Sequence, residues 1–229
     1  MKIGGLQKLT LLDFPGRCAC TVFTVGCNMR CPFCHNAPLV TGETPALIDE
    51  GEVLALLQKR RGVLDGVCFT GGEPLLQPDL PDLIRRIREL GFAVKLDTNG
   101  TLPDRLAALL NEGLLDYVAM DIKNAPERYA ETVGVPDFDV TNIDRSIRIL
   151  QNGKTPFEFR TTVVRELHSP KDFQKIADWL QGDEPYFLQQ FVDSGDLIET
   201  GFSAYSKAEM EGFLPRISPK VPRVAIRGV

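Results

Sequence analysis

Three closely spaced cysteines are the residues of this sequence with the most specific chemical potential. Cys27, Cys31 and Cys34 follow C-x3-C-x2-C spacing in a segment that also contains Asn, Arg, Pro and His. Soft thiolates this close together suit an iron–sulfur cluster or zinc. Three thiolates on a four-iron cube leave one iron without a protein ligand, and a substrate or cofactor could bind there.

Two other interpretations of the cysteines are weaker. A Cys3His zinc site could use His35, but Cys34 and His35 are adjacent and would struggle to ligate one tetrahedral ion. Unliganded buried cysteines do not suit so polar a segment. The spacing therefore favours a cluster.

Further candidate ligands follow several apolar segments. Paired glycines such as Gly71 and Gly72 let a ligand approach the backbone, although a turn that needs positive φ would also explain them. Asp97 and Asp121 could share a cation through their oxygens, although a cap or Asx turn would explain Asp97. Lys123 could equally be a solvated charge. The candidates are Gly71, Gly72, Glu73, Asp97, Thr98, Asn99, Met120, Asp121, Lys123, Arg160 and Gln190, the last of which could instead pair with nearby backbone.

The elements that must position these residues alternate between strands and helices. Apolar runs rich in β-branched residues predict strands, and the stretches between them have helical period. Ser169 with Asp172 and Asp49 with Glu52 are typical of helix starts. One helical stripe contains Leu80, Leu83, Ile84, Ile87 and Leu90. The expected strands are Cys18 to Val25, Gly66 to Thr70, Phe92 to Thr98, Asp116 to Ile122, Phe157 to Val164 and Pro185 to Val192.

This alternation predicts an α/β fold, a partial (β/α)6 TIM-like barrel with a parallel sheet that is open on one side. We expect a single domain over residues 1–229, with a core of about 18–192 and a C-terminal helix and tail over 193–229. Ligands of parallel α/β folds bind at the carboxyl ends of the strands, where the candidate residues stand.

Composition narrows the functional classes. A formal charge of −5 and a pI near 5.2 give no electrostatic footprint for nucleic acid or an anionic membrane. The start of the sequence lacks a signal-peptide pattern, and no apolar run is long enough to span a bilayer. We therefore expect a cytoplasmic protein whose six cysteines are not disulfides.

The cysteine loop, with Phe33 as the aromatic residue of C-x3-C-x-Φ-C, resembles the signature of radical S-adenosylmethionine enzymes. Gly71, Gly72 and Glu73, followed by proline, resemble the family's GGE-P motif, which contacts the methionine amine. The resemblance implies a [4Fe-4S] cluster on the three cysteines. It also implies that S-adenosylmethionine chelates the open iron and that one electron cleaves it to a 5′-deoxyadenosyl radical.

The polar residues after the third and fourth strands resemble the pyruvate formate-lyase activating enzyme branch. There a DT pair and an M-D-x-K segment bind a monovalent cation, which here implies Asp97, Thr98, Met120 and Asp121 as its ligands. Lys123 and Arg160 would supply positive charge to the cofactor. The expected cofactor contacts also include Phe33, His35 and Asn99. Gln190, at the end of the sixth strand, could reach the adenosine, although this branch of the family often has another residue type there.

The segment Leu12 to Arg17 resembles the D-G-P-G-x-R stretch of glycyl-radical-enzyme activases, with Phe14 in place of the usual glycine. The similarity is greatest to the anaerobic ribonucleoside-triphosphate reductase activating protein group. It implies formation of a glycyl radical on a partner reductase, an electron donor such as flavodoxin, and a role for Asp13 in holding the incoming glycine backbone. Asp13 could instead cap its own loop.

Two other functions stay open. The first is radical chemistry on a small molecule, as in a carboxy-deazaguanine synthase relative, and the second is a non-enzymatic metal-binding protein. No cysteine follows Cys68, so the sequence cannot supply an auxiliary cluster, and a single-cluster activase fits better.

Overall fold

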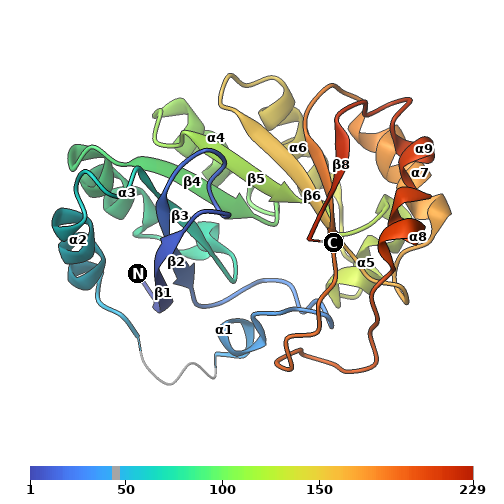
Figure 1. Cartoon of the computed structure of the whole chain (residues 1–229), viewed down its shortest axis with the longest axis horizontal. Coiled ribbons are helices and arrows are strands. Elements are labelled where there is room, and N and C mark those ends of the chain that lie inside the picture. The colour runs from blue at the N-terminus through green and yellow to red at the C-terminus, as the bar shows by residue number, and fades with distance from the viewer. Residues whose placement is uncertain (43–46, 229) are drawn as a thin grey trace. The chain divides into compact units, whose positions relative to one another are not determined.

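The computed structural model describes residues 1–42 and 47–228, and within these residues it has eight strands in one sheet (Figure 1). The strands follow one another across the sheet in sequence order, as the alternating βα pattern predicts. They are β1 (Ile3–Thr10), β2 (Ala19–Thr24), β3 (Gly66–Gly71), β4 (Ala93–Thr98), β5 (Tyr117–Asp121), β6 (Phe157–Val163), β7 (Tyr186–Gln190) and β8 (Val224–Arg227).

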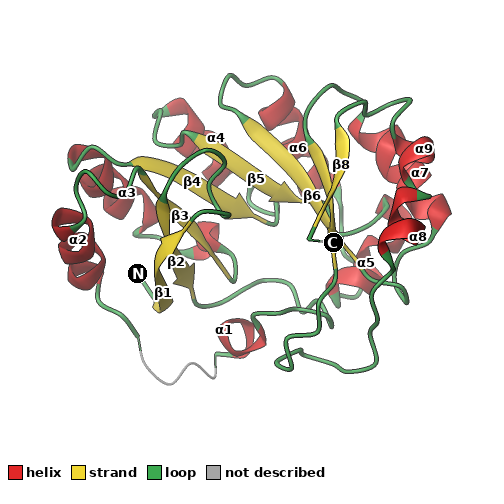
Figure 2. Cartoon of the chain, viewed as in Figure 1, coloured by secondary structure: helices red, strands yellow, loops and turns green. Residues whose placement is uncertain are grey.

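Helices separate most of the successive strands (Figure 2). In the described part of the chain, no helix is both long and apolar enough to cross a membrane. The α-helices are α1 (Ala37–Thr41), α2 (Glu50–Lys59), α3 (Leu80–Glu89), α4 (Pro103–Asn111), α5 (Tyr129–Val133), α6 (Thr141–Gln151), α7 (Pro170–Leu180), α8 (Lys207–Glu211) and α9 (Leu214–Ile217), and short 3-10 turns span Pro74–Leu76 and Pro126–Arg128.

The six strands predicted from the sequence correspond to β2 through β7, and the structure adds one strand at each end. β1 pairs antiparallel with β2, so the sheet is mostly rather than wholly parallel, and β8 pairs parallel with β7. The predicted helix starts are confirmed, because Asp49 and Ser169 both form capping boxes. The predicted stripe of α3 is buried except for Leu90, which is half-buried at the end of the helix.

The chain divides into two compact units, and the single domain expected over 1–229 stays a prediction. The first unit contains Met1–Asn28, Pro38–Ala119 and Lys154–Pro156, and the second contains Met29–Ala37, Met120–Gly153 and Phe157–Val229. The division falls within two segments: the cysteine loop is divided after Asn28, and β5 is divided after Ala119.

The first unit contains β1 to β4, and its parallel pairings align the carboxyl ends of the strands. Thr24 at the end of β2 pairs with Gly71 at the end of β3, and Phe69 of β3 pairs with Leu96 of β4. Several apolar side chains of β2, β3 and β4, among them Val22, Phe69 and Val94, are fully buried, as is the inner stripe of α3. This packing places the start of the cysteine loop, the Gly-Gly segment and the end of β4 on one edge of the unit.

The second unit contains β6, β7 and β8 with α5 to α9. Inside it, the hydroxyls of Thr161 and Tyr186 lie 2.7 Å apart, and the rings of Phe173 and Phe213 stack with centroids 4.8 Å apart. Burial of these aromatic rings against the strands stabilises the unit, and buried hydroxyls of this kind need a partner.

Candidate functional site

Backbone contacts in the first unit hold the Cys27 end of the cysteine loop. Gly26, which precedes Cys27, donates its N–H to the carbonyl of Leu39 at 2.8 Å, and its own carbonyl accepts from the N–H of Glu73 at 2.8 Å. Gly72 packs so closely that a Cβ there would lie 2.0 Å from the Gly26 carbonyl oxygen. Gly71 has a φ of 111°, so the positive-φ turn, one of the two interpretations that the sequence left open, is present in the structure. Approach of a ligand to the backbone of the two glycines stays a prediction.

Backbone contacts in the second unit hold the rest of the loop. The N–H of Arg30 donates to the carbonyl of Val133 at 2.8 Å, and a Cβ at Gly134 would lie 2.3 Å from the Arg30 carbonyl oxygen. A tight turn follows, in which the N–H of Cys34 donates to the carbonyl of Cys31 at 3.0 Å. The side chain of Cys31 is buried, and that of Cys34 is half-buried.

The two rings of this loop pack inside the second unit. Phe33 is buried and meets Phe202 edge to face with centroids 6.5 Å apart, and His35 stacks on Phe191 at 5.5 Å. Burial and the charge of Lys123 lower the pKa of His35, so its ring is neutral near pH 7. Contact of either ring with a cofactor stays a prediction.

Glu73 positions the residues that follow β4. Its carboxylate is fully buried and accepts from the N–H of Leu75 at 3.0 Å, from the hydroxyl of Thr98 at 2.9 Å and from the N–H of Asn99 at 2.7 Å. Three donors satisfy a buried carboxylate that would otherwise be costly. Glu73 therefore fixes the end of β4, whereas its predicted contact with a cofactor is not tested.

Asn99 links the end of β4 to the first cysteine. Its Nδ2 lies 3.8 Å from Cys27 Sγ and 3.0 Å from Asn28 Oδ1, while its Oδ1 accepts from the N–H of Thr101 at 3.0 Å. These contacts fix which end of the amide faces the sulfur. An N–H donor beside a thiolate stabilises its negative charge, which suits a sulfur that binds metal.

Lys95, which the sequence analysis did not single out, accompanies Asp97 on β4. Its ammonium is buried in an ion pair with Asp97 Oδ1. The available signal was a lysine at an interior position of the predicted strand Phe92 to Thr98, where apolar residues are usual.

Asp121, Lys123 and Arg160 form an ion-pair cluster in the second unit. Lys123 Nζ lies 2.8 Å from one carboxylate oxygen of Asp121, and Arg160 Nη2 lies 3.0 Å from the other. Burial acts to raise the pKa of Asp121, but the two cations outweigh it and lower that pKa to about 2. Burial acts to lower the pKa of Lys123, but Asp121 and the thiols of Cys31 and Cys34 raise it above its ordinary value.

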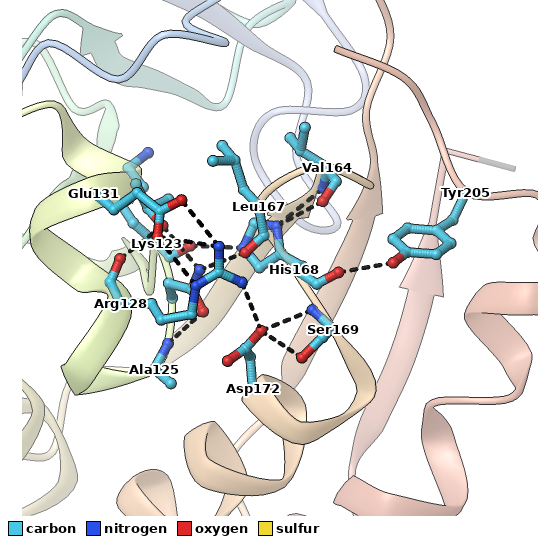
Figure 3. Close-up of polar contacts among 12 residues, drawn as sticks. Lys123, Ala125, Arg128, Glu131, Val164, Leu167, His168, Ser169, Asp172 and Tyr205 are labelled. Atoms are coloured by element: carbon cyan, nitrogen blue, oxygen red, sulfur yellow. Dashed lines mark hydrogen bonds and ion pairs between the residues drawn. The ribbon is translucent and has the colours of Figure 1, made fainter.

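His168 contacts the backbone of Lys123 through its ring (Figure 3). His168 Nε2 lies 2.8 Å from the carbonyl of Lys123, and its Nδ1 accepts from the N–H of Val164 at 3.1 Å. Nδ1 is therefore unprotonated, and Nε2–H donates to Lys123. Tyr205 donates its hydroxyl to the His168 carbonyl at 2.7 Å. This supporting role could not be predicted from the sequence, because a single histidine outside any motif does not indicate which backbone groups its ring will contact.

The remaining candidates are tied to their own neighbourhoods. Gln190 donates to the carbonyl of Tyr205 at 2.8 Å, which is the backbone pairing left open from the sequence. Asp13 accepts from the hydroxyl of Thr21 at 2.6 Å, and its N–H donates to Thr10 Oγ1 at 3.2 Å. Met120 is buried in the core. Contacts of Gln190 with a cofactor and of Asp13 with a partner stay predictions.

The donor set of the loop fits an iron–sulfur cluster. None of the six cysteines forms a disulfide. The three loop sulfurs include one beside an amide donor and two that interact electrostatically with the Lys123 ammonium. Such positive surroundings suit thiolate ligands. In residues 1–42 and 47–228, no three His, Cys, Asp or Glu side chains are arranged as a metal site, so cluster binding stays a prediction.

Comparison with known proteins assigns the family. The profile of the radical SAM superfamily matches residues 21–180. A Methanocaldococcus jannaschii protein named as a glycyl-radical enzyme activating enzyme is 32% identical over 193 residues, which cover 82% of this chain and 79% of that protein. The 7-carboxy-7-deazaguanine synthase of Methanopyrus kandleri is 38% identical over 199 residues, 76% of this chain and 73% of the enzyme.

A solved structure confirms the fold class. The radical SAM methyltransferase of Sphaerobacter thermophilus superposes with a TM-score of 0.74 and 18% identity, covering 96% of this chain and 68% of that one. At this identity the likeness concerns the fold alone, which is the predicted α/β partial barrel with an open sheet. The profile match and the similarity to the Methanocaldococcus jannaschii protein identify an enzyme with radical SAM chemistry, and the chain belongs to the radical SAM superfamily.

Proposed function

We propose that this chain is an activase that reductively cleaves S-adenosylmethionine at a [4Fe-4S] cluster and generates a glycyl radical on a partner enzyme. The observation that carries the proposal is the cysteine loop, whose C-x3-C-x2-C spacing leaves one iron of a cube open. Similarity to a protein named as a glycyl-radical enzyme activating enzyme supports the activase role.

The chain's own residues have distinct tasks in this proposal. Cys27, Cys31 and Cys34 hold the cluster, which when bound supplies the electron that breaks the sulfonium bond of S-adenosylmethionine. The Gly71 and Gly72 backbone binds the methionine amine. Lys123 and Arg160, oriented by Asp121, offer positive charge to its carboxylate.

The partner we propose is an anaerobic ribonucleoside-triphosphate reductase, with flavodoxin as the electron donor. The adenosyl radical abstracts one hydrogen atom from the α-carbon of a glycine, giving 5′-deoxyadenosine and a glycyl radical. The Leu12 to Arg17 segment supports this choice of client, and Asp13 would accept a backbone N–H of the incoming peptide. The net charge of −5 argues against nucleic acid as the partner, and six cysteines without a disulfide suit the reducing cytoplasm.

The cluster is tested by anaerobic reconstitution of the wild-type chain and two cysteine variants. The wild type should hold about four iron and four sulfide per chain and release 5′-deoxyadenosine after reduction, whereas Cys31→Ala should lose both properties. Cys20→Ala is the matched control, because Cys20 is buried and its burial raises the pKa of the thiol to about 11. Wild-type protein that binds zinc and no iron would refute the proposal.

The activase role is tested by electron paramagnetic resonance with a candidate reductase. After incubation with reduced enzyme and S-adenosylmethionine, the reductase should carry a persistent doublet from a glycyl radical. Replacing the reductase glycine expected to carry the radical, near the carboxyl end of that chain, by alanine should abolish the doublet, which would exclude a radical on another residue.

A second candidate function is radical chemistry on a small molecule. The observation in its favour is the similarity to the Methanopyrus kandleri enzyme, which at 38% is the higher of the two identities. Brisk S-adenosylmethionine cleavage without any doublet, together with turnover of a deazaguanine precursor, would favour this alternative over the activase.

A further inference from the structure

The buried lysine of β4 lies where its ammonium can neutralise Asp97. The Lys95 side chain is 1% exposed, and its Nζ forms an ion pair with Asp97 Oδ1. Nζ also lies 3.7 Å from Cys68 Sγ, and the same sulfur lies 3.8 Å from Asp97 Oδ1. Ammonium, carboxylate and thiol thus form one compact cluster inside the first unit.

Strand geometry places these groups on the same face. Cys68 of β3 pairs with Lys95 of β4 in the parallel register, and paired residues of neighbouring strands point the same way. Asp97 follows Lys95 by two positions on the same strand, so it shares that face. A lysine at position 95 is long enough to bring its charge to the carboxylate.

A second cation at Asp97 would meet a nearby charge of the same sign. The Lys95 side chain is buried on its strand, so its ammonium cannot move into solvent to make room for another cation. Repulsion between two unit charges about 4 Å apart lowers affinity by roughly a thousandfold at an effective dielectric constant of about 20. The carboxylate expected to bind a monovalent cation therefore already has its counter-charge.

The other expected carboxylate ligand is neutralised in the same manner. Asp121 in the second unit pairs with both Lys123, at 2.8 Å, and Arg160, at 3.0 Å. Within each unit, the acidic member of the expected cation set thus has a cationic side chain of this chain as its partner. The residues present do not fit a monovalent metal ion.

We propose that the Lys95 ammonium takes the place of a monovalent cation beside Asp97, so that this enzyme needs neither K⁺ nor Na⁺. Lys95 is in this view a positioning residue that fixes the charge and orientation of the Asp97 carboxylate. The inference does not depend on the identity of the client enzyme.

The proposal is tested by measuring the melting temperature of the full chain in two salts. The salts are potassium chloride and tetramethylammonium chloride at equal ionic strength. The wild type should melt at the same temperature in both salts. Lys95→Ala removes the charge and leaves room for an ion, so it should melt roughly 6–20 °C lower in tetramethylammonium. Potassium should restore at least half of that loss. Lys95→Met fills the space without charge and should melt low in both salts.

The matched control is Lys220→Ala, which removes an exposed lysine–aspartate pair with Asp178. It should show no difference between the salts, because solvent already screens that carboxylate. A Lys95→Ala variant that melts identically in both salts would overturn the proposal.

A second measurement does not require any variant to fold. The affinity of the reconstituted wild type for S-adenosylmethionine should change less than about twofold when potassium replaces tetramethylammonium, well below the tenfold that a 1.4 kcal/mol contribution would give. A tenfold or greater gain in potassium would overturn the proposal. If S-adenosylmethionine does not bind at all, the proposed function fails, while the unfolding experiment still decides the role of Lys95.

Discussion

Adding one methyl group at Gly72 should displace the cysteine loop without unfolding the chain. In Gly72→Ala the new Cβ would lie 2.0 Å from the carbonyl oxygen of Gly26 and 2.7 Å from its carbonyl carbon. Both atoms are backbone, so no side-chain rotation can relieve the contact. Real Cβ atoms essentially never approach closer than 3.0 Å, so the two segments must separate by about 1 Å.

The magnitude follows from what that separation disturbs. Overpacking of this kind costs about 1–3 kcal/mol, which lowers the melting temperature by roughly 2–12 °C in a chain of this size. Cys27 directly follows Gly26, so its thiolate moves with the displaced carbonyl. Misplacing a reacting group by 1 Å can cost about a hundredfold in rate. The variant should therefore stay folded while its cleavage of S-adenosylmethionine falls by about that factor.

The assay combines circular dichroism, iron and sulfide content, and 5′-deoxyadenosine release under reducing, anaerobic conditions. Gly5→Ala is the matched control, because the atoms nearest to its Cβ would be side-chain atoms of Phe23, at an ordinary 3.4 Å or more. That variant should match the wild type in all three measurements. A Gly72→Ala variant with full cluster content and wild-type cleavage would refute the reasoning, because the loop would then not depend on this contact.

Two further predictions concern the second unit. Asp121→Asn leaves the charges of Lys123 and Arg160 without their shared carboxylate. Because 28% of the Asp121 side chain is exposed, the cost should lie between that of an exposed and a buried ion pair. We expect the free energy of unfolding, measured in urea, to fall by about 2–3 kcal/mol. An unchanged midpoint would contradict it. Burial lowers the pKa of His168 below its ordinary 6.5, so the unfolded chain binds more protons there, and stability should fall as pH drops below about 6.5. His168→Gln should flatten part of that decline in unfolding free energies measured between about pH 7.5 and pH 5. An equally steep decline in the variant would exclude His168 as a source.

The strands that could be predicted are those whose sequence matches their burial. β2 and β3 are rich in apolar residues, as is usual for strands covered on both faces, and β4 has buried Val94 and Leu96 beside the polar Lys95 and Asp97. β1 was not predicted, because it begins with Ile-Gly-Gly and continues with polar Gln7 and Lys8 and so lacks the apolar run of the other strands. It lies at the edge of the sheet beside β2, and its middle residues are partly exposed and carry no apolar alternation.

The candidate site was predictable as far as the ends of parallel strands define it. That rule places Gly72, Glu73 and Asn99 on one edge of the first unit before any coordinates are known. The partners of these side chains depend on packing between segments far apart in the sequence. Glu73 was expected to face a cofactor, and in the structure its carboxylate accepts from Thr98, the last residue of β4, and from Asn99, which follows it. A sequence motif identifies Glu73 as a candidate, but it does not predict which groups donate hydrogen bonds to its carboxylate.

The cysteine loop has a glycine contact at each end, and only one of the two could be inferred from the sequence. Gly72 stands in a recognisable motif, whereas Gly134 follows α5 with φ of 63°, which a helix C-cap explains by itself. Its second constraint is the Arg30 carbonyl, 2.3 Å from where a Cβ would be. In each unit the loop therefore packs backbone against backbone. The path of the loop from Gly26 to Arg30, and with it the position of Cys27, is then set by backbone contacts with the two glycines.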